Sequence, residues 1–168
     1  MTRIVTNLDT KQHNQLDSFE KGRLFEEYVI KLFSERYFEL KEWRRSEKII
    51  DPFLLSTYSN PDLELVFMGV KKHRFAIECK WKNKFIDGKI AWAPERKIRV
   101  YKEFQNKTGM PVFIAIGIGG SPSSPEKLFV TPLDHICKCS EVYESGLIPY
   151  KRKPTNKFFY DTVQLRLW

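Results

Sequence analysis

The stretch RFAIECKW, residues 74–81, alternates between apolar and polar side chains and decides the fold that we expect. Successive side chains of a β-strand point to opposite faces of the sheet. One face of this strand carries Phe75, Ile77, Cys79 and Trp81, and the other carries Ala76, Glu78 and Lys80. The apolar face can pack into a core. The acid and the amine then project together from the opposite face, where such a pair needs a partner to be tolerated.

The preceding stretch NPDLE, residues 60–64, places an acid at the start of another strand. Residues 62–70 and the strand above predict an antiparallel hairpin, because a short polar turn separates them. A hairpin of this kind brings Asp62 close to Glu78 and Lys80, at the end of the second strand. We therefore expect three ionisable side chains to converge on one side of the sheet.

The rest of the chain predicts helices and strands around this hairpin. Asp17 and Ser18 are helix N-caps, and apolar residues at helical spacing follow them. Pro94 suits the first turn of a second helix, which stops at Gly109. The expected elements are a helix over 18–36, a poorly alternating strand over 37–48, the hairpin, a helix over 94–107, strands over 111–118 and 127–131, and a half-exposed strand over 162–167. This order predicts a mixed α/β domain with a central sheet, whose strand over 111–118 is covered on both faces.

Composition and charge narrow the class of protein. The 168 residues are most simply one domain with a hydrophobic core, since 42% of them are hydrophobic. The formal net charge of +8 favours a polyanionic partner, because each Lys or Arg beside a backbone phosphate releases condensed counterions. No apolar run is long enough for a membrane span, and the N-terminus lacks a signal-peptide core. We expect a cytoplasmic protein that does not bind membranes.

The three cysteines, Cys79, Cys137 and Cys139, argue against a disulfide framework because their number is odd and no secretion signal accompanies them. Together with His135, the last two suggest a zinc site. Only three ligands are present locally, however, and the spacing lacks the usual Cys-x-x-Cys geometry. A reduced pair after a strand is the favoured interpretation.

The converging charges suit the hydrolysis of a phosphodiester bond. That reaction requires neutralised charge on the scissile group, an activated water and a stabilised leaving oxygen, and Mg²⁺ held by hard oxygen ligands can supply all three. Asp62 and Glu78 offer two carboxylates, and the backbone carbonyl of Cys79 offers a third oxygen. Lys80 can hold the attacking water or offset charge in the transition state. We expect Mg²⁺ as the cofactor, with Mn²⁺ as its substitute.

Pro61-Asp62 followed by Glu78-Cys79-Lys80 resembles the PD-(D/E)xK nuclease signature, and KGRLFE, residues 21–26, resembles the first helix of its Holliday-junction-resolvase-like and Mrr-like branches. The resemblance implies a restriction-endonuclease-like core, a central mixed β-sheet flanked by helices in the order α-β-β-β-α-β-β. It also implies metal-dependent endonuclease activity on DNA. The resemblance covers about residues 18–132, so that 133–168 form a C-terminal extension of a single nuclease-like domain over 1–168.

The resemblance further carries Glu26 over as an acid that assists through a second metal or a water. Helical geometry favours it over Glu27, because Glu26 borders the apolar stripe while Glu27 falls on the opposite, solvated side. Family members often place a polar residue of the second helix toward the site, which points to Lys97 or Tyr101. The expected phosphate contacts are the basic residues Lys82, Lys84, Arg96, Lys97 and Arg99. Making double-strand breaks with one metal site would usually call for a homodimer.

Several alternatives stay open. Glu78 and Lys80 can form a structural ion pair while Asp62 caps a turn, and the basic residues can form a solvated face. The protein would then be a non-catalytic nucleic-acid-binding or scaffold protein with a nuclease-like fold. Glu64, on the face of Asp62, is either a solvated residue or a water-mediated metal ligand. Trp81 and Trp92 are core residues or platforms for unpaired bases. A small-molecule enzyme finds little support, because no Gly-rich loop opens a helix.

Overall fold

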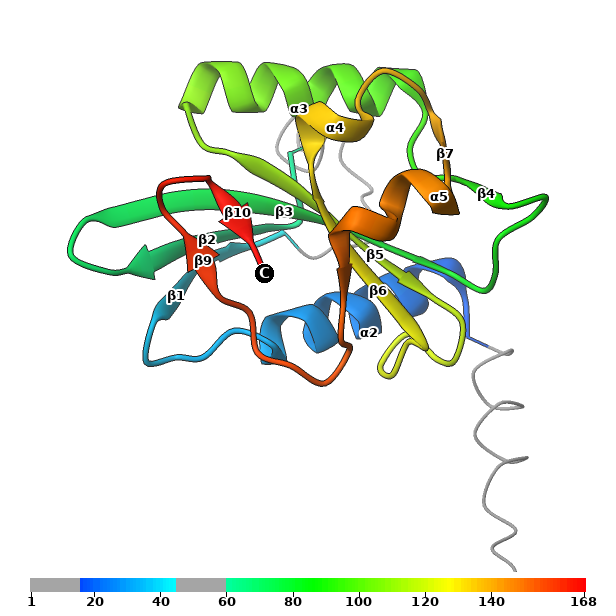
Figure 1. Ribbon diagram of the computed structural model, residues 1–168, viewed down its shortest axis with the longest axis horizontal. Coiled ribbons are helices and arrows are strands. Elements are labelled where there is room, and N and C mark those ends of the chain that lie inside the picture. Colours follow the sequence, from blue (N-terminus) through cyan, green and yellow to red (C-terminus); the bar gives the residue numbers. More distant parts are fainter. Residues whose placement is uncertain (1–15, 45–59) are drawn as a thin grey trace, which may run out of the picture.

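A six-stranded mixed sheet forms the centre of the molecule in the computed structural model, which describes residues 16–44 and 60–168 (Figure 1). Its strands in spatial order are β1 (Phe38–Trp43), β2 (Leu63–Met68), β3 (Lys72–Lys82), β5 (Val112–Ile118), β6 (Lys127–Pro132) and β8 (Lys151–Arg152). β3 and β5 are parallel, and the other neighbouring strands are antiparallel. The predicted hairpin is confirmed, because β2 pairs with β3 in the expected direction.

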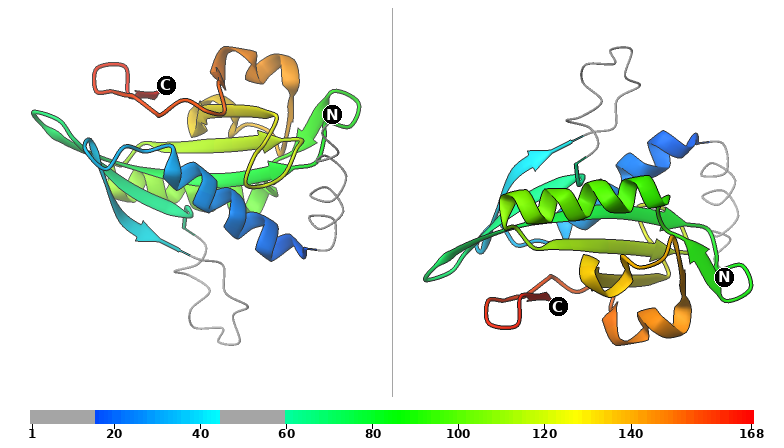
Figure 2. Two further views of the ribbon diagram at one scale, coloured as in Figure 1. Left: turned by 90° about the horizontal axis from the view of Figure 1, so that it is seen from below. Right: turned by 90° about the horizontal axis from the view of Figure 1, so that it is seen from above.

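Helices cover both faces of this sheet, as Figure 2 shows from two sides. α2 (Ser18–Lys31) packs on one face and α3 (Glu95–Thr108) on the other. The Asp17 carboxylate accepts a hydrogen bond from the Glu20 amide at 2.8 Å and caps α2. α3 ends at Gly109, whose φ of 67° lies in the left-handed region that glycine adopts without strain. The arrangement confirms the predicted fold class, an α/β domain with a central mixed sheet between helices.

Two elements are shorter than the sequence predicts. The first helix was expected to reach residue 36, but α2 ends at Lys31, and the Leu32 amide bonds to the carbonyl only three residues back, at 3.1 Å. This tighter turn breaks the helical repeat. The first strand was expected over 37–48. The structure has β1 at Phe38–Trp43, and residues 45–48 lie outside the described residues, as does the predicted loop over 49–59.

Two apolar cores fill the space between the sheet and its helices. The fully buried strand β5 contributes to both, since alternate side chains face opposite sides. Toward α2, Phe113 and Ala115 pack with Phe25 and Val29 of the helix. Toward α3, the residues of the second core include Ile114, Ile116, Ile98, Tyr101 and Phe104. The prediction that this strand is covered on both faces is confirmed.

The residues after β6 return to the central sheet through one strand, β8, which pairs with β6. They comprise α4 (Leu133–Ile136), β7 (Glu141–Tyr143), α5 (Glu144–Leu147), the 3₁₀ turn η3 (Ile148–Tyr150), β8, and a small hairpin of β9 (Tyr160–Asp161) and β10 (Arg166–Leu167). A separate two-stranded sheet forms where β7 pairs with β4 (Lys89–Ala91). Phe158, Tyr160 and Leu167 are buried in the core beneath α2. The Tyr160 ring stacks on that of Phe75, with 4.9 Å between centroids.

The predicted half-exposed strand over 162–167 is wrong. The Asp161 carboxylate accepts hydrogen bonds from the amides of Val163 and Gln164 at 2.8 and 2.9 Å, which makes a turn of this segment. Leu165 has a φ of 50°, far from an extended backbone. Only the two residues of β10 pair as a strand. Among the helices of the described residues, none has both the length and the apolar character needed to cross a membrane.

Gly117 of β5 lies directly against the Phe25 ring of α2, where an added Cβ would clash. We expect Gly117→Ala to lower the free energy of unfolding by about 1–3 kcal/mol, because it overpacks a dense core. Urea denaturation measures this change. Gly22→Ala in α2 is the control, since a Cβ there meets nothing within 4 Å. It should be neutral or stabilise by up to about 1 kcal/mol, and equal losses in both variants would contradict the packing argument.

Candidate active site

Asp62 and Glu78 meet where β2 begins and β3 approaches its end. Leu63 pairs with Ile77, so the register continued by one residue sets Asp62 opposite Glu78. Oδ2 of Asp62 accepts a hydrogen bond from the amide of Cys79 at 2.8 Å. The Lys80 ammonium donates a hydrogen bond to Oε1 of Glu78 and pairs with it. The three ionisable side chains therefore converge, as the hairpin predicts.

The face that carries Glu78 is covered by α3 rather than open to solvent. Glu78 is only 3% exposed, and the buried Tyr101 of α3 shares a hydrogen bond with its carboxylate. Burial raises the pKa of Tyr101, and the nearby Glu78 raises it further, so this hydroxyl keeps its proton. Of the two residues suggested on this helix, Tyr101 hydrogen-bonds Glu78, while Lys97 is half-buried one turn earlier.

Glu26 reaches the same centre from the opposite layer. It is buried, and its Oε2 accepts a hydrogen bond from Nε1 of Trp43 at 2.6 Å. Glu27 instead forms an ion pair with Arg23 at the surface. A cleft of about 410 Å³ is lined by residues of α2 and β3 together with the acids: Ser18, Phe19, Lys21, Gly22, Glu26, Asp62, Cys79, Lys80, Trp81, Lys82 and Asn83. Two acids and Lys80 thus share one opening to solvent.

Negative charge dominates this centre. Burial raises the pKa of Glu26 to about 7, against the lowering effect of the Trp43 hydrogen bond, and Glu78 raises it further. Burial and the charge of Glu78 also raise the pKa of Asp62 well above its ordinary value. Burial alone would lower the pKa of Lys80, but the two neighbouring carboxylates outweigh it and raise that pKa. Three acids beside one lysine leave the centre short of positive charge, which a divalent cation would supply.

The donor set fits an open magnesium site. Within residues 16–44 and 60–168, no group of three or more His, Cys, Asp or Glu side chains is placed to hold a metal ion by itself. Mg²⁺ is usually held by one or two carboxylates with water and substrate phosphates, rather than by such a group of side chains. Asp62 and Glu78 match that pattern in chemistry. Burial raises the pKa of the Cys79 thiol well above its ordinary value, so only the backbone carbonyl of this residue suits a hard cation.

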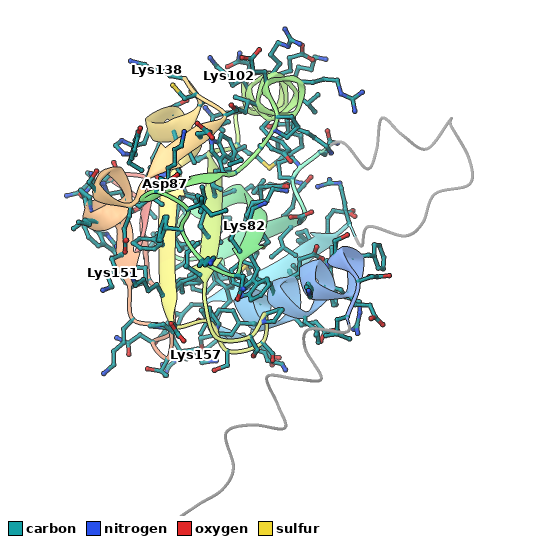
Figure 3. All side chains as sticks on the ribbon, turned by 90° about the vertical axis from the view of Figure 1, so that its right-hand side faces the viewer. Lys82, Asp87, Lys102, Lys138, Lys151 and Lys157 are labelled. Atoms are coloured by element: carbon teal, nitrogen blue, oxygen red, sulfur yellow. The ribbon has the colours of Figure 1, made fainter. Side chains whose placement is uncertain are left out.

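The predicted phosphate contacts lie on different elements, and most of them do not line the cleft. Lys82 ends β3 and lines the cleft, and Figure 3 shows it between the α2 and α3 layers. Lys84 is exposed in the loop that follows β3. Arg96 and Arg99 are exposed on the first half of α3. Of these residues, Lys82 alone is among those that line the cleft with the acids.

The structure also bears on the open roles of Glu64 and of the two tryptophans, because it shows how buried these side chains are and what they bind. Glu64 is 5% exposed, and its carboxylate pairs with Arg44 and Arg74, so it is neither a solvated residue nor free to hold a water-mediated metal. Trp92 is 1% exposed and donates its indole N–H to the carbonyl of Cys139 at 2.8 Å, which excludes base stacking. Trp81 is half-buried, lines the cleft and donates to the carbonyl of Gly119 at 3.2 Å.

The zinc interpretation of the cysteine segment gains no support. Nε2 of His135 lies 3.0 Å from the carbonyl oxygen of Gly146. Cys137 and Cys139 are free thiols, and Sγ of Cys137 donates to the carbonyl of Asp134. No set of metal ligands is found here among the described residues.

Glu26 is expected to make the stability of the metal-free protein depend on pH. Its pKa is about 7 in the folded state against an ordinary 4.5, so between these values the folded protein holds a proton that the unfolded chain releases. Through Glu26, the free energy of unfolding should therefore rise as the pH falls from 7 to 5, and this one group contributes at most about 1.4 kcal/mol per pH unit. Urea titrations in EDTA at pH 5, 6 and 7 measure this slope.

Glu26→Gln should make that slope shallower, whereas Glu27→Gln, at the surface, should leave it unchanged. In both variants Asp62, whose pKa is also raised, still contributes to the pH dependence of the free energy of unfolding. Equal slopes in the two variants would refute the assignment to Glu26.

Comparison with known proteins gives a likeness of fold. No protein-family model matches the sequence, and no curated protein matches it. Among solved structures, the Holliday junction resolvase Hjc of the archaeal hyperthermophile Archaeoglobus fulgidus aligns with a TM-score of 0.52, over 78% of this chain and 93% of that chain. The two sequences are 14% identical, so the likeness concerns the fold alone.

Proposed function

We propose that this protein is a metal-dependent endonuclease that hydrolyses phosphodiester bonds of DNA, from the resolvase-like or Mrr-like branch of the PD-(D/E)xK nucleases. The observation that carries the proposal is the meeting of Asp62, Glu78 and Lys80 at the end of a hairpin. The cleft beside them is lined by further basic residues, Lys21 and Lys82. The fold shared with a resolvase and the net charge of +8 support a DNA partner.

Asp62 and Glu78 would hold Mg²⁺ or Mn²⁺ together with the backbone carbonyl of Cys79. Such an ion would supply positive charge for the scissile phosphate and would make a water easier to deprotonate. Tyr101 holds the Glu78 carboxylate in place from α3.

Lys80 stays protonated, because the carboxylates around it raise its pKa. It therefore orients the attacking water and stabilises negative charge as a hydrogen-bond donor, and it does not act as a base. Glu26, whose pKa is about 7, is suited to accept the proton of that water near neutral pH. The water oxygen then bonds to phosphorus as the bond to the leaving oxygen breaks.

A cleavage assay tests the proposal. The purified protein is incubated with supercoiled plasmid, a four-way junction, single-stranded DNA and RNA, each in Mg²⁺, Mn²⁺ or EDTA. We expect metal-dependent cleavage of at least one DNA. Linear plasmid as the first product would indicate that two copies cut both strands as a homodimer. Cleavage that persists unchanged in EDTA would overturn the metal-dependent mechanism.

A protein that only binds nucleic acid gives a different result. It would bind DNA in a salt-sensitive way without turnover, and Lys82→Ala combined with Lys84→Ala would weaken binding more than Glu78→Ala. That outcome would replace the nuclease assignment with a binding function.

A further inference from the structure

An irregularity in β1 changes which side chains face the acidic centre. Leu40 pairs with Leu65 of β2, but Glu42 pairs with Glu64, so Lys41 is an extra residue in the ladder. Such a β-bulge switches the faces of all side chains that follow it. The poor alternation of this strand in the sequence has the same cause.

This change of face determines which side of the sheet Trp43 and Arg44 occupy. Phe38, before the bulge, faces the core beneath α2. In a regular strand, Arg44 would share that face and Trp43 would point toward α3. With the extra residue, Trp43 packs against the core beneath α2 and reaches Glu26, while Arg44 faces α3.

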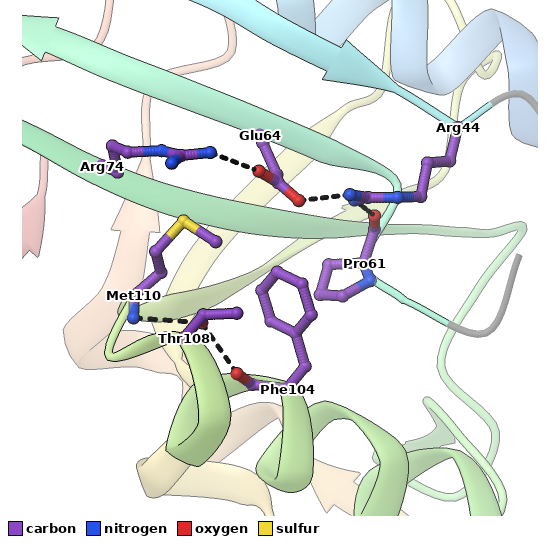
Figure 4. Close-up of polar contacts among 7 residues, drawn as sticks. All are labelled: Arg44, Pro61, Glu64, Arg74, Phe104, Thr108 and Met110. Carbon is purple, nitrogen blue, oxygen red and sulfur yellow. Dashed lines mark hydrogen bonds and ion pairs between the residues drawn. The ribbon is translucent and has the colours of Figure 1, made fainter. Parts of the chain in front are cut away.

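Arg44 holds the chain next to Asp62 with three donors, and Figure 4 shows the two that belong to its guanidinium. Its amide donates to the carbonyl of Asp62 at 2.7 Å, and its Nη1 donates to the carbonyl of Pro61 at 2.8 Å. Its Nη2 pairs with Glu64, and the guanidinium lies 5.8 Å from the centre of the Phe104 ring on α3. The side chain is 13% exposed, so these contacts are made largely out of water.

Arg74 provides an internal comparison. It also donates to Glu64, at 3.1 Å, but its side chain is 58% exposed. Its guanidinium hydrogen-bonds the Glu64 carboxylate through Nη2 and Oε2, on the side away from Arg44 Nη2. Of the two arginines, it is therefore Arg44 that couples the Glu64 carboxylate to the backbone that carries Asp62.

We propose that the bulge in β1 makes Trp43 and Arg44 positioning residues of the acidic centre: Trp43 orients Glu26, and Arg44 fixes the Pro61–Asp62 backbone so that Asp62 faces Glu78. Glu64 serves as the counter-charge that keeps the guanidinium in place. The expected effect on cleavage rests on the proposed nuclease function, but the placement of Asp62 can be measured without any cleavage.

The Cys79 amide, which donates to Asp62, reports that placement through hydrogen exchange. In Arg44→Ala we expect its exchange in the metal-free protein to quicken by about tenfold relative to that of Ile77, the buried neighbour on the same strand. Arg44→Lys, which keeps a cation for Glu64 but lacks the planar fork, should give the same selective change. Arg74→Ala should leave the Cys79 amide unchanged. Equal acceleration at Cys79 and Ile77 in the Arg44 variants, or no acceleration, would overturn the positioning by Arg44.

Cleavage kinetics then test the consequence. Arg44→Lys and Trp43→Phe should lower kcat by about tenfold or more with little change in KM for DNA, since misplaced catalytic groups weaken the transition state and not the binding of substrate. Arg74→Ala should keep the wild-type kcat.

Equal kcat losses in Arg44→Lys and Arg74→Ala would reject the special position of Arg44. An unchanged kcat in Trp43→Phe would reject the assignment of Trp43. A wild-type protein that cuts no DNA would refute the proposed function, while the exchange result would still decide whether Arg44 positions Asp62.

Discussion

Asp62→Asn is expected to lower the rate of DNA cleavage by at least about 1000-fold, the equivalent of about 4 kcal/mol of lost transition-state stabilisation. The amide keeps the size of the side chain and can still accept the hydrogen bond from the Cys79 amide. It removes the negative charge proposed to hold the metal. Single-turnover cleavage in Mg²⁺ measures the loss.

The same substitution should not destabilise the metal-free protein. Burial and the neighbouring Glu78 raise the pKa of Asp62, which means that its charge is unfavourable in the folded state. At pH 8 in EDTA, Asp62→Asn should therefore be at least as stable as the wild type in urea. Asp87→Asn is the matched control, because Asp87 is exposed in the loop after β3 and its φ of 50° suits asparagine equally well. An Asp62→Asn protein that still cuts at the control rate would remove this residue from the mechanism.

Lys80→Met should lower kcat by about 100- to 1000-fold, as expected for the loss of one donor aimed at developing charge. The methionine side chain preserves much of the apolar stem but leaves Glu78 without its ion pair. In EDTA we also expect a loss of about 1–3 kcal/mol in the free energy of unfolding, because the buried Glu78 carboxylate loses its cationic partner and keeps the Tyr101 hydroxyl alone. Steady-state cleavage and urea denaturation together measure both effects.

Lys72→Met is the control for that experiment, since Lys72 is an exposed lysine of the same strand, β3. Its kcat and stability should stay close to those of the wild type. If Lys80→Met and Lys72→Met gave similar kcat values, Lys80 would be a structural ion-pair residue, and the alternative without catalysis would be favoured.

The hairpin and its charges are predictable from the sequence because strict alternation fixes the face of each side chain. In residues 74–81 one face is wholly apolar and Ala76 is the single apolar residue of the other, so Glu78 and Lys80 could be assigned to one face and Asp62 brought next to them. The helix that starts after Pro94 is equally clear, because a proline opens it and a glycine closes it. Local rules suffice in these segments, and the structure follows them.

The contacts around the site are less predictable because they depend on irregular backbone. The bulge at Lys41 disrupts the alternation of β1, and with it the evidence that Trp43 and Arg44 face different layers. Tyr101 could be suggested on its helix, but its bond to Glu78 depends on how α3 packs. In the C-terminal segment, the alternation of residues 162–167 is a false signal, since the turn made by Asp161 prevails over it.

The burial of Tyr160 against Phe75 has a practical consequence for anyone who wishes to isolate the nuclease-like region. A shortened protein that stopped at residue 132 would keep every proposed catalytic group. It would nevertheless expose a broad aromatic surface that Phe158, Tyr160 and Leu167 now cover. Such a fragment should aggregate on expression, so the last 36 residues belong in any minimal version made for crystallisation or for transfer to another protein.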